Sequence, residues 1–511
     1  MKFLEKQFSF SKVVFVAAFV LFVVHAYTNI GYFHADEHYQ IIEFAGIKLG
    51  SHQSADLAWE YKEASRQTIQ PAIAYVLFMG AGFFHVNDPY ILAFLLRLLT
   101  ALVALSAIAF FVKNVQPMVA PESGKTLIFL SFFLWFIPAV NVRFSSESWS
   151  GIFILFMLAM ILGERKSNRY KHLVVGLFMG LAFLFRFQSA FLSLGVIAWL
   201  LTIKRIAFRD FIALTFGGAI TLVFGFLVDS WFYGKLVFTP WTYFDKQILQ
   251  GIAAGFGESE WWFYLWEILR APTIPFGILI ASSLIIIIFR RPKSILLWAI
   301  LPFIIGHSFV AHKEVRFLLP LVNLVPLLLV TAFDEINALR MKHFASNTFE
   351  TTLMFKGLAM ILLAMNATAL LVMATKPAGT GKMAITAYIA ENYPGQQIHL
   401  LHTPWSSPYN PWESVPTKFY QIEGLTETRI RNLCQVSDSL LQNDKTNLLV
   451  TRMAELNVKN CSDPFLANSR TILLKQSIPD WILWLNKGYK GIYEDDVLFL
   501  YAVKEGGLHN Q

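Results

Sequence analysis

Long apolar runs, separated by short polar segments, occupy most of the chain before residue 376. Runs of this kind form helices that cross a hydrocarbon core of about 30 Å. The pattern predicts about eleven transmembrane helices, near residues 13–30, 90–112, 126–140, 148–163, 173–186, 187–203, 211–231, 272–289, 294–311, 316–333 and 357–375. We therefore expect a mainly helical, polytopic membrane protein.

One apolar segment, Pro71–His85, is left out of this count. It is short for a span, contains two glycines and follows a polar stretch, which favours a helix lying at the membrane interface within the first outer loop. With the N-terminus inside and this segment not crossing, Lys and Arg concentrate in the inner loops, among them 164–171 and 290–293. The positive-inside rule supports that orientation.

The composition changes after residue 375, where polar residues, proline and asparagine become more frequent. We expect a transmembrane domain over residues 1–375 and a small soluble α/β domain over 376–511, on the outer face. Within the second domain the pattern predicts strands at Gln397–Leu401, Leu448–Thr451 and Val497–Ala502, and a helix at Thr426–Leu441.

The composition as a whole agrees with a membrane protein: 56% of the 511 residues are hydrophobic, only 15% are charged, and the mean hydropathy is +0.52. The net charge of +8 comes from short clusters between apolar runs, which are typical of orientation signals and not of a nucleic-acid surface. The two cysteines, Cys434 and Cys461, both lie in the soluble domain, and the sequence leaves open whether they pair.

A cluster of titratable residues follows the first apolar run directly. Asp36 and Glu37 stand between His34 and His38. Ionised side chains at the edge of a membrane cost free energy unless they face water or a partner, so the cluster indicates a functional site. These residues include possible metal ligands, but neighbouring positions on a helix do not converge on one ion, and we expect no metal or other cofactor.

Further motifs follow in order along the chain. They are Trp59-Glu-Tyr61, Arg66, Arg143-Phe-Ser-Ser-Glu147, Phe232-Tyr-Gly-Lys-Leu-Val-Phe-Thr-Pro240, His312-Lys-Glu-Val-Arg-Phe-Leu-Leu-Pro320 and His402-Thr-Pro-Trp-Ser-Ser407. Together with His34-Ala-Asp-Glu37, this ordered set resembles glycosyltransferase family 22, the dolichyl- or polyprenyl-phosphate-mannose-dependent mannosyltransferases with the GT-C membrane fold. Such enzymes build GPI anchors and N-glycan precursors. Ala35 and Ser146 depart from the usual proline and asparagine of the family.

The resemblance implies an inverting membrane glycosyltransferase that moves mannose from a polyprenyl-phosphate donor to a lipid-linked or GPI-like glycan. Its partners would be the donor, a glycolipid or glycan acceptor and membrane lipid, without nucleic acid. It would reside in a bacterial cytoplasmic membrane or the endoplasmic reticulum membrane, with the site on the periplasmic or lumenal side. A transporter or flippase of lipid-linked sugars, a scaffold subunit that has lost catalysis, and a GT-C enzyme with another donor sugar stay open as alternatives.

Sugar transfer requires a base for the acceptor hydroxyl and cations for the departing phosphate. We expect Asp36 to be the base, with Glu37 as second choice or positioning partner. The alternative is that Asp36 only caps a helix over Glu37–Ile47. Asp36 must then share a cavity on one membrane face with Arg316.

The cationic candidates for the donor phosphate are His312, Lys313, Arg316 and Arg186. For His312, Lys313 and Arg316 the alternative is that the charges reach toward the interface, with Glu314 neutralising one of them. For Arg186 the alternative is a buried ion pair with Glu147 or a bond to a backbone carbonyl.

The remaining candidates are assigned to substrate binding. Trp261 and Glu258 lie in a segment of tryptophans interleaved with carboxylates, which is equally typical of an interfacial aromatic belt. The other expected contacts are His34, Glu60, Arg66, Arg143 and, in the C-terminal domain, His402 with Trp405 beside it.

Overall fold

The computed structural model describes residues 2–163, 170–343, 349–411, 415–467, 471–489 and 493–504. Among them, six helices are long and apolar enough to cross a membrane: Phe10–Thr28, Pro89–Met118, Phe187–Lys204, Phe208–Tyr233, Val315–Arg340 and Lys356–Thr375. Each corresponds to a predicted span, so the expectation of a mainly helical membrane protein is confirmed. The crossing count of eleven stays a prediction, and loop 164–171 lies mostly outside the described residues.

The chain divides into two compact units, each built from segments distant in sequence. The first contains Met1–Ala26, Glu63–Ile73 and Arg97–Met373, and the second contains Tyr27–Lys62, Ala74–Leu96 and Ala374–Gln511. The second unit thus combines the C-terminal segment with two N-terminal stretches. The domain boundary at residue 375 stays a prediction.

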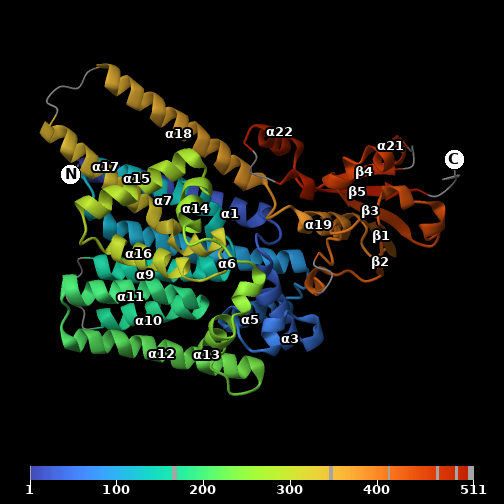
Figure 1. Cartoon of the computed structure of the whole chain (residues 1–511), viewed down its shortest axis with the longest axis horizontal. Helices are drawn as coiled ribbons and strands as arrows, with labels where there is room; N and C mark the ends of the chain where they lie inside the picture. The colour runs from blue at the N-terminus through green and yellow to red at the C-terminus, as the bar shows by residue number, and fades with distance from the viewer. Residues whose placement is uncertain are drawn as a thin grey trace. The chain divides into compact units, whose positions relative to one another are not determined.

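Helices account for the first unit (Figure 1). They are α1 Lys2–Thr28, α6 Pro89–Val115, α7 Gly124–Phe133, α8 Phe136–Asn141, α9 Ser146–Leu162, α10 Lys171–Phe185, α11 Ala190–Trp199, α12 Phe208–Tyr233, α13 Thr239–Phe244, α14 Phe263–Arg270, α15 Ile274–Arg290, α16 Ile295–Ser308, α17 Val325–His343 and α18 Phe349–Thr375. Ends of α1, α6 and α18 extend into the second unit. A 3₁₀ segment, Val315–Leu324, leads into α17.

The predicted span 126–140 is wrong as a continuous helix, because the chain is extended at Leu134 between α7 and α8. Asn366 of α18 bridges the break: its Nδ2 donates to the Phe133 carbonyl at 2.7 Å, and its Oδ1 accepts from the Trp135 N–H at 2.9 Å. A broken helix in a membrane needs such partners for its released backbone groups. One polar residue in a distant span therefore permits the interruption.

In the second unit, the segment around Asp36 forms a helix in three parts. These are α2 Ala35–Glu37, a π-helical turn His38–Ile42, and α3 Glu43–Leu49. The helices α4 Trp59–Lys62 and α5 Ile69–Phe83 follow, and the first residues of α5, as far as Ile73, belong to the first unit. The apolar segment Pro71–His85 is therefore helical over most of its length, and its interfacial position stays a prediction.

The C-terminal part of the second unit contains a five-stranded sheet of order β2-β1-β3-β5-β4. The strands are β1 Ile398–His402, β2 Leu425–Arg429, β3 Thr446–Arg452, β4 Thr471–Gln476 and β5 Leu498–Val503. β1 is parallel to β2 and β3, whereas β5 is antiparallel to β3 and β4. The helices α19 Lys382–Asn392, α20 Met453–Leu456, α21 Lys459–Ala467 and α22 Asp480–Tyr489 accompany it.

Burial separates the predicted strands from the missed ones. β1, β3 and β5 are almost wholly buried, and their apolar side chains form one core with Ile385 and Ile389 of α19. The helix predicted at Thr426–Leu441 is wrong, because its first residues form β2, an edge strand paired with β1. β4, the opposite edge, was not predicted. A disulfide joins Cys434 to Cys461, which answers the question of their pairing.

The C-terminal segment is tied to the end of α1 within the second unit. Thr28 Oγ donates to the Ala374 carbonyl at 2.6 Å, and Asn29 Nδ2 donates to the Lys376 carbonyl at 3.0 Å. In the other direction, the Ala378 N–H donates to the Ile30 carbonyl at 2.9 Å. The residues that follow α1 and α18 therefore form one connected base for this unit.

Candidate active site

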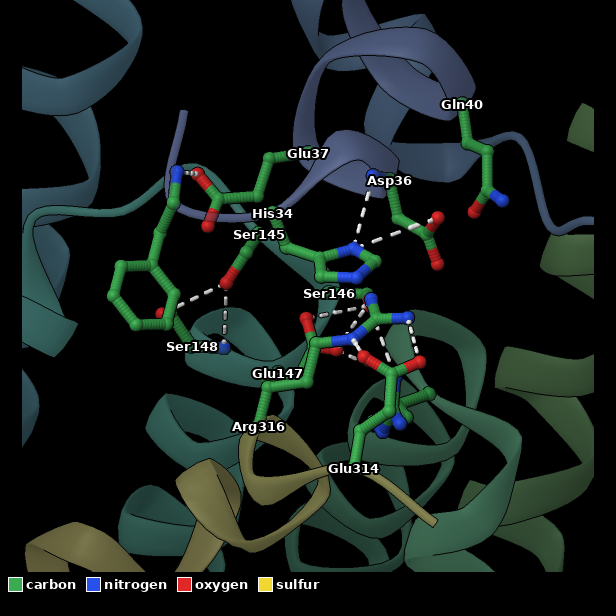
Figure 2. A network of polar contacts seen from close by, with 12 residues as sticks. His34, Asp36, Glu37, Gln40, Ser145, Ser146, Glu147, Ser148, Glu314 and Arg316 are labelled. Atoms are coloured by element: carbon green, nitrogen blue, oxygen red, sulfur yellow. Dashed lines mark hydrogen bonds and ion pairs between the residues drawn. The ribbon is translucent and has the colours of Figure 1, made fainter. Parts of the chain in front are cut away.

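Asp36 and Glu37 have different surroundings although they are adjacent. The Asp36 carboxylate is 23% exposed and its Oδ1 lies 3.7 Å from His34 Nδ1. Glu37 is buried, and its Oε2 accepts from the Phe33 N–H at 3.3 Å. The cap of α2 is His34, whose Nδ1 accepts from the Asp36 N–H at 3.3 Å (Figure 2). The interpretation of Asp36 as the cap is therefore wrong, and Asp36 is the more accessible carboxylate.

A third carboxylate of this region, Glu43, was missed by the sequence analysis. It is fully buried; Oε1 accepts from His38 Nε2 at 2.6 Å and from the Phe419 N–H at 3.2 Å, while His52 Nε2 bonds Oε2. Burial opposes ionisation, but His38 and His52 outweigh it and lower the pKa of Glu43 to about 2. The carboxylate is therefore ionised at neutral pH and accepts from both imidazoles.

Glu60, expected to contact substrate, is buried and accepts from Gln40 Nε2 at 2.7 Å. Gln40 lies in the π-helical turn, so this bond joins the turn to α4. Its geometry is that of a support for the segment after Asp36.

In the first unit, Glu147 lies between two arginines. Its Oε1 accepts from Arg186 Nη1 at 2.8 Å and from Arg316 Nη1 at 3.2 Å, and all three side chains are buried (Figure 2 labels Glu147 and Arg316). Glu147 is in the first turn of α9, Arg186 directly follows α10, and Arg316 is in the 3₁₀ segment. The ion pair expected as the alternative for Arg186 is thus present, and it also includes Arg316.

The motif around Arg316 supplies a second carboxylate. Glu314 accepts from Arg316 Nε at 2.7 Å and Nη2 at 2.9 Å, and its Oε1 lies 2.9 Å from His312 Nε2. Lys313 turns to another segment and donates to the Ser259 carbonyl at 2.6 Å. The pKa of Lys313 is lowered because burial disfavours its charge, and the nearby Glu260 and Glu258 offset this only in part. The loop therefore holds its cations with different partners.

The Arg186 guanidinium has hydrogen-bonding capacity left over. Among the described residues, none accepts a hydrogen bond from its buried Nε or Nη2. The ring of Phe317 lies close to both guanidinium groups. Its centroid is 4.6 Å from the Arg186 Cζ atom and 5.3 Å from the Arg316 Cζ atom. Two buried cations around one shared carboxylate oxygen can bind a further anion.

Arg66 and Arg143, two further candidates, also belong to the first unit. The Arg66 guanidinium is 5.8 Å from the centre of the Tyr243 ring. The backbone carbonyl of Arg66 accepts a hydrogen bond from Tyr233 Oη at 2.8 Å. Arg143 is buried just before α9. Asp229, which the sequence analysis missed, is buried in α12 and accepts from the N–H and Oγ of Thr68, both at 2.7 Å.

The candidates for acceptor binding differ in exposure. Trp261 is 64% exposed and Glu258 is exposed beside it. His402 ends β1 and is buried, with Nδ1 3.2 Å from the Thr403 carbonyl, whereas Trp405 is exposed. Asp36 belongs to the second unit and Arg316 to the first. That both face one cavity stays a prediction.

A model of the Alg9-like mannosyltransferase family matches residues 13–421. GPI mannosyltransferase 3 of Yarrowia lipolytica is 27% identical over 339 residues, covering 64% of this chain and 62% of the relative. GPI alpha-1,2-mannosyltransferase 3 of Danio rerio is 24% identical over 276 residues, covering 51% and 48%. The matched part of this chain thus spans about three fifths or less of these relatives.

Among solved structures, ArnT from Cupriavidus metallidurans bound to undecaprenyl phosphate is similar with a TM-score of 0.48 and 13% sequence identity. The superposition covers 97% of this chain and 99% of that one.

Proposed function

Since the chain belongs to the Alg9-like mannosyltransferase family, we propose that it transfers mannose from a polyprenyl-phosphate donor to a lipid-linked or GPI-like glycan, with inversion at the anomeric carbon. The names of the relatives support a GPI-type acceptor. The family match includes every candidate residue from His34 to His402.

The cluster of Arg186, Glu147 and Arg316 is the observation that carries this proposal. Transfer breaks the bond between the anomeric carbon and the phosphate oxygen, and the lipid phosphate leaves with the electron pair. Arg186 has two buried nitrogens, Nε and Nη2, whose N–H groups have no acceptor among the described residues, and a phosphate would supply oxygens for them. Lys313 and His312 would add charge from the adjacent loop, although Glu314 partly neutralises that loop.

Asp36 is the proposed general base. It accepts the proton of the acceptor hydroxyl as that oxygen forms its bond to the anomeric carbon. Its partial exposure supports this role over Glu37, which is buried and bonded to its own loop. Glu37 then acts as a positioning partner.

For the acceptor, we propose contacts with Glu258 and Trp261, whose exposure leaves them accessible to a glycan. His34, Arg66 and Arg143 stay proposed substrate contacts. Glu60 and His402 are buried, so a direct contact would require them to move.

We propose that the site faces the periplasm or the lumen of the endoplasmic reticulum. The Cys434–Cys461 disulfide supports export of the C-terminal part, because disulfides persist in oxidising compartments. The lysines and arginines of the predicted inner loops support the same orientation.

The test is an assay of the purified protein in lipid nanodiscs with polyprenyl-phosphate mannose and a mannosylated glycolipid. Asp36→Asn should lower kcat by about 100- to 10,000-fold, the usual contribution of general-base catalysis, and the product should carry the inverted anomer. Asp88→Asn is the matched control, because Asp88 caps α6 through the N–H groups of Tyr90 and Ile91, and asparagine caps equally well.

Undiminished transfer by Asp36→Asn would overturn the base assignment. Movement of the donor lipid across vesicles without any transfer would overturn the enzyme proposal in favour of a transporter.

A further inference from the structure

A short segment of the C-terminal part, Thr417–Tyr420, contacts the residues just after Asp36 within the second unit. We name this segment the clasp. The Phe419 N–H donates to Glu43 Oε1 at 3.2 Å, and Thr417 Oγ lies 2.7 Å from Tyr39 Oη. The Tyr420 ring stacks on the His38 imidazole, with centroids 5.3 Å apart and planes inclined by 16°. These three contacts join the clasp to the π-helical turn and to α3.

We propose that the clasp is a positioning element for the transfer reaction and that it acts through Glu43 of α3, a positioning residue. Through His38, Glu43 holds α2 and therefore Asp36 in place. The inference rests on the proposed function, because it assigns the clasp an effect on the step that Asp36 performs.

The first argument is the place of Asp36 in its helix. Asp36 lies in α2, Ala35–Glu37, the first part of the three-part helix, which passes directly into the π-helical turn. His34 caps the start of α2. The His38 N–H donates to the Ala35 carbonyl, so the backbone of His38 joins the part that carries Asp36 to the turn that follows.

The second argument is how firmly His38 is held. Its ring stacks on Tyr32, with centroids 5.2 Å apart and planes at 22°, and also on Tyr420 of the clasp. Its Nε2 bonds Glu43 at 2.6 Å. Stacking on two aromatic rings together with a charge-assisted bond restricts the orientation of the imidazole.

The third argument is the number of groups that depend on Glu43. A buried carboxylate is stable only when its lone pairs are filled, and His38, His52 and the Phe419 N–H fill them. Removing the clasp would take the Phe419 N–H donor away from Glu43 and open the carboxylate to water. The held geometry of His38 therefore depends on the clasp being seated.

An independent observation comes from the family match, which ends at residue 421, directly after the clasp. Strands β2 to β5 lie beyond that point. The clasp therefore belongs to the part of the chain that the family shares, together with Asp36, whereas most of the sheet does not.

The test measures kcat and donor KM separately for Glu43→Gln in nanodiscs, at a temperature where the variant is folded. Glutamine keeps the shape but loses the charge that holds the two imidazoles. Because a misplaced base slows chemistry without weakening donor binding, kcat should fall by about 10- to 100-fold with donor KM within about twofold.

Thr417→Val and Tyr39→Phe are gentler variants. Each removes one of the two hydroxyls that form the hydrogen bond between the clasp and the π-helical turn. Each should lower kcat by a smaller factor, and the double variant should be no slower than the slower single variant, because both remove one interaction. They keep the proposal testable if Glu43→Gln does not fold.

Asp334→Asn is the control for a purely structural effect. Asp334 accepts from the Ala120 N–H at 2.8 Å and from Ser123 Oγ at 2.5 Å in the first unit, so its loss lowers stability away from the clasp. Unchanged kcat in Asp334→Asn with reduced kcat in the clasp variants is the expected result. Unchanged kcat in all of these variants would overturn the proposed role of the clasp. The proposed function would still stand in that case if Asp36→Asn abolishes transfer. Wild-type protein without transfer would overturn both.

Discussion

Two buried glutamates, one in each unit, each bind two basic side chains, but the bases differ. Glu147 binds Arg186 and Arg316, whose charge is permanent at any physiological pH. Glu43 binds the imidazoles of His38 and His52. The charges of the Glu147 cluster are therefore fixed: Glu314 balances Arg316, and the buried Nε and Nη2 of Arg186 have no acceptor among the described residues, so they can donate to an anion.

The Glu43 cluster is built from imidazoles instead. Its carboxylate accepts from two imidazoles and one backbone N–H. This arrangement is suited to holding segments together. Similar burial thus accompanies two tasks, and the chemistry of the partners tells them apart.

Replacing Glu147 should have the largest effect. Glu147→Gln leaves two buried guanidiniums without their shared counter-charge, and breaking a buried pair in this way costs about 3–5 kcal/mol of unfolding free energy. The measurement is denaturant-induced unfolding in detergent.

The matched control is Glu335→Gln. Glu335 also accepts from two arginines, Arg290 and Arg291, but these are 46% and 43% exposed. Its loss should cost about 0.2–1 kcal/mol. Equal losses for the two variants would contradict the importance of burial.

The Glu43 cluster should depend on pH in a defined direction. The pKa of Glu43 falls from 4.5 to about 2 on folding, because His38 and His52 outweigh the effect of burial. A lowered folded-state pKa contributes stability that is complete above the unfolded value and is lost as the pH falls toward the folded value.

The stability gap between wild type and Glu43→Gln should therefore narrow as the pH drops below about 4.5, by on the order of 3 kcal/mol in total. Unfolding free energies at a series of pH values measure it. A gap that stays constant down to pH 3 would refute the assigned interaction.

Arg316→Lys tests whether the Glu147 cluster needs geometry as well as charge. Arg316 uses Nε, Nη1 and Nη2 on two carboxylates, and a lysine ammonium cannot reproduce this fork. We expect kcat/KM for the donor to fall about tenfold, which corresponds to about 1.4 kcal/mol. Arg291→Lys, at the exposed pair, should leave kcat/KM unchanged, and an equal decrease there would show that the effect is not local.

The smallest effect is expected from Lys418→Ala. Lys418 lies in the clasp, but its ion pair with Asp56 at 2.6 Å is partly exposed. Such pairs contribute about 0.2–1 kcal/mol, so thermal stability should change little. If Lys418→Ala lowered the stability as much as Glu43→Gln does, the exposed ion pair, and not the buried contacts, would hold the clasp in place.

The chemistry of the Glu147 cluster was largely predictable from the sequence. Arg186, Arg316 and the possible pairing of Arg186 with Glu147 all follow from charged residues beside apolar runs, which are rare and therefore noticeable. Glu43 gives no such signal. It follows an apolar pair as the first residue of α3, and one of its donors is the backbone N–H of Phe419, which no side-chain pattern reveals.

The same contrast explains the errors in the fold. β1, β3 and β5 are buried apolar runs and were predicted, whereas β2 and β4 are edge strands whose polar residues mask their period. The break between α7 and α8 depends on Asn366, more than 200 residues later. Span prediction from hydropathy does not include such a distant partner.

The π-helical turn after Asp36 makes segment length a constraint in its own right. Side chains five residues apart in an α-helix point about 140° away from each other, but His38 and Glu43 meet because the wider turn holds one more residue, with the Glu43 N–H donating to the His38 carbonyl. Inserting one more amino acid between them would turn Glu43 away from the imidazole, whereas deleting one would return the pair to the four-residue spacing at which α-helical side chains share a face. The turn therefore tolerates the loss of a residue but not the gain of one.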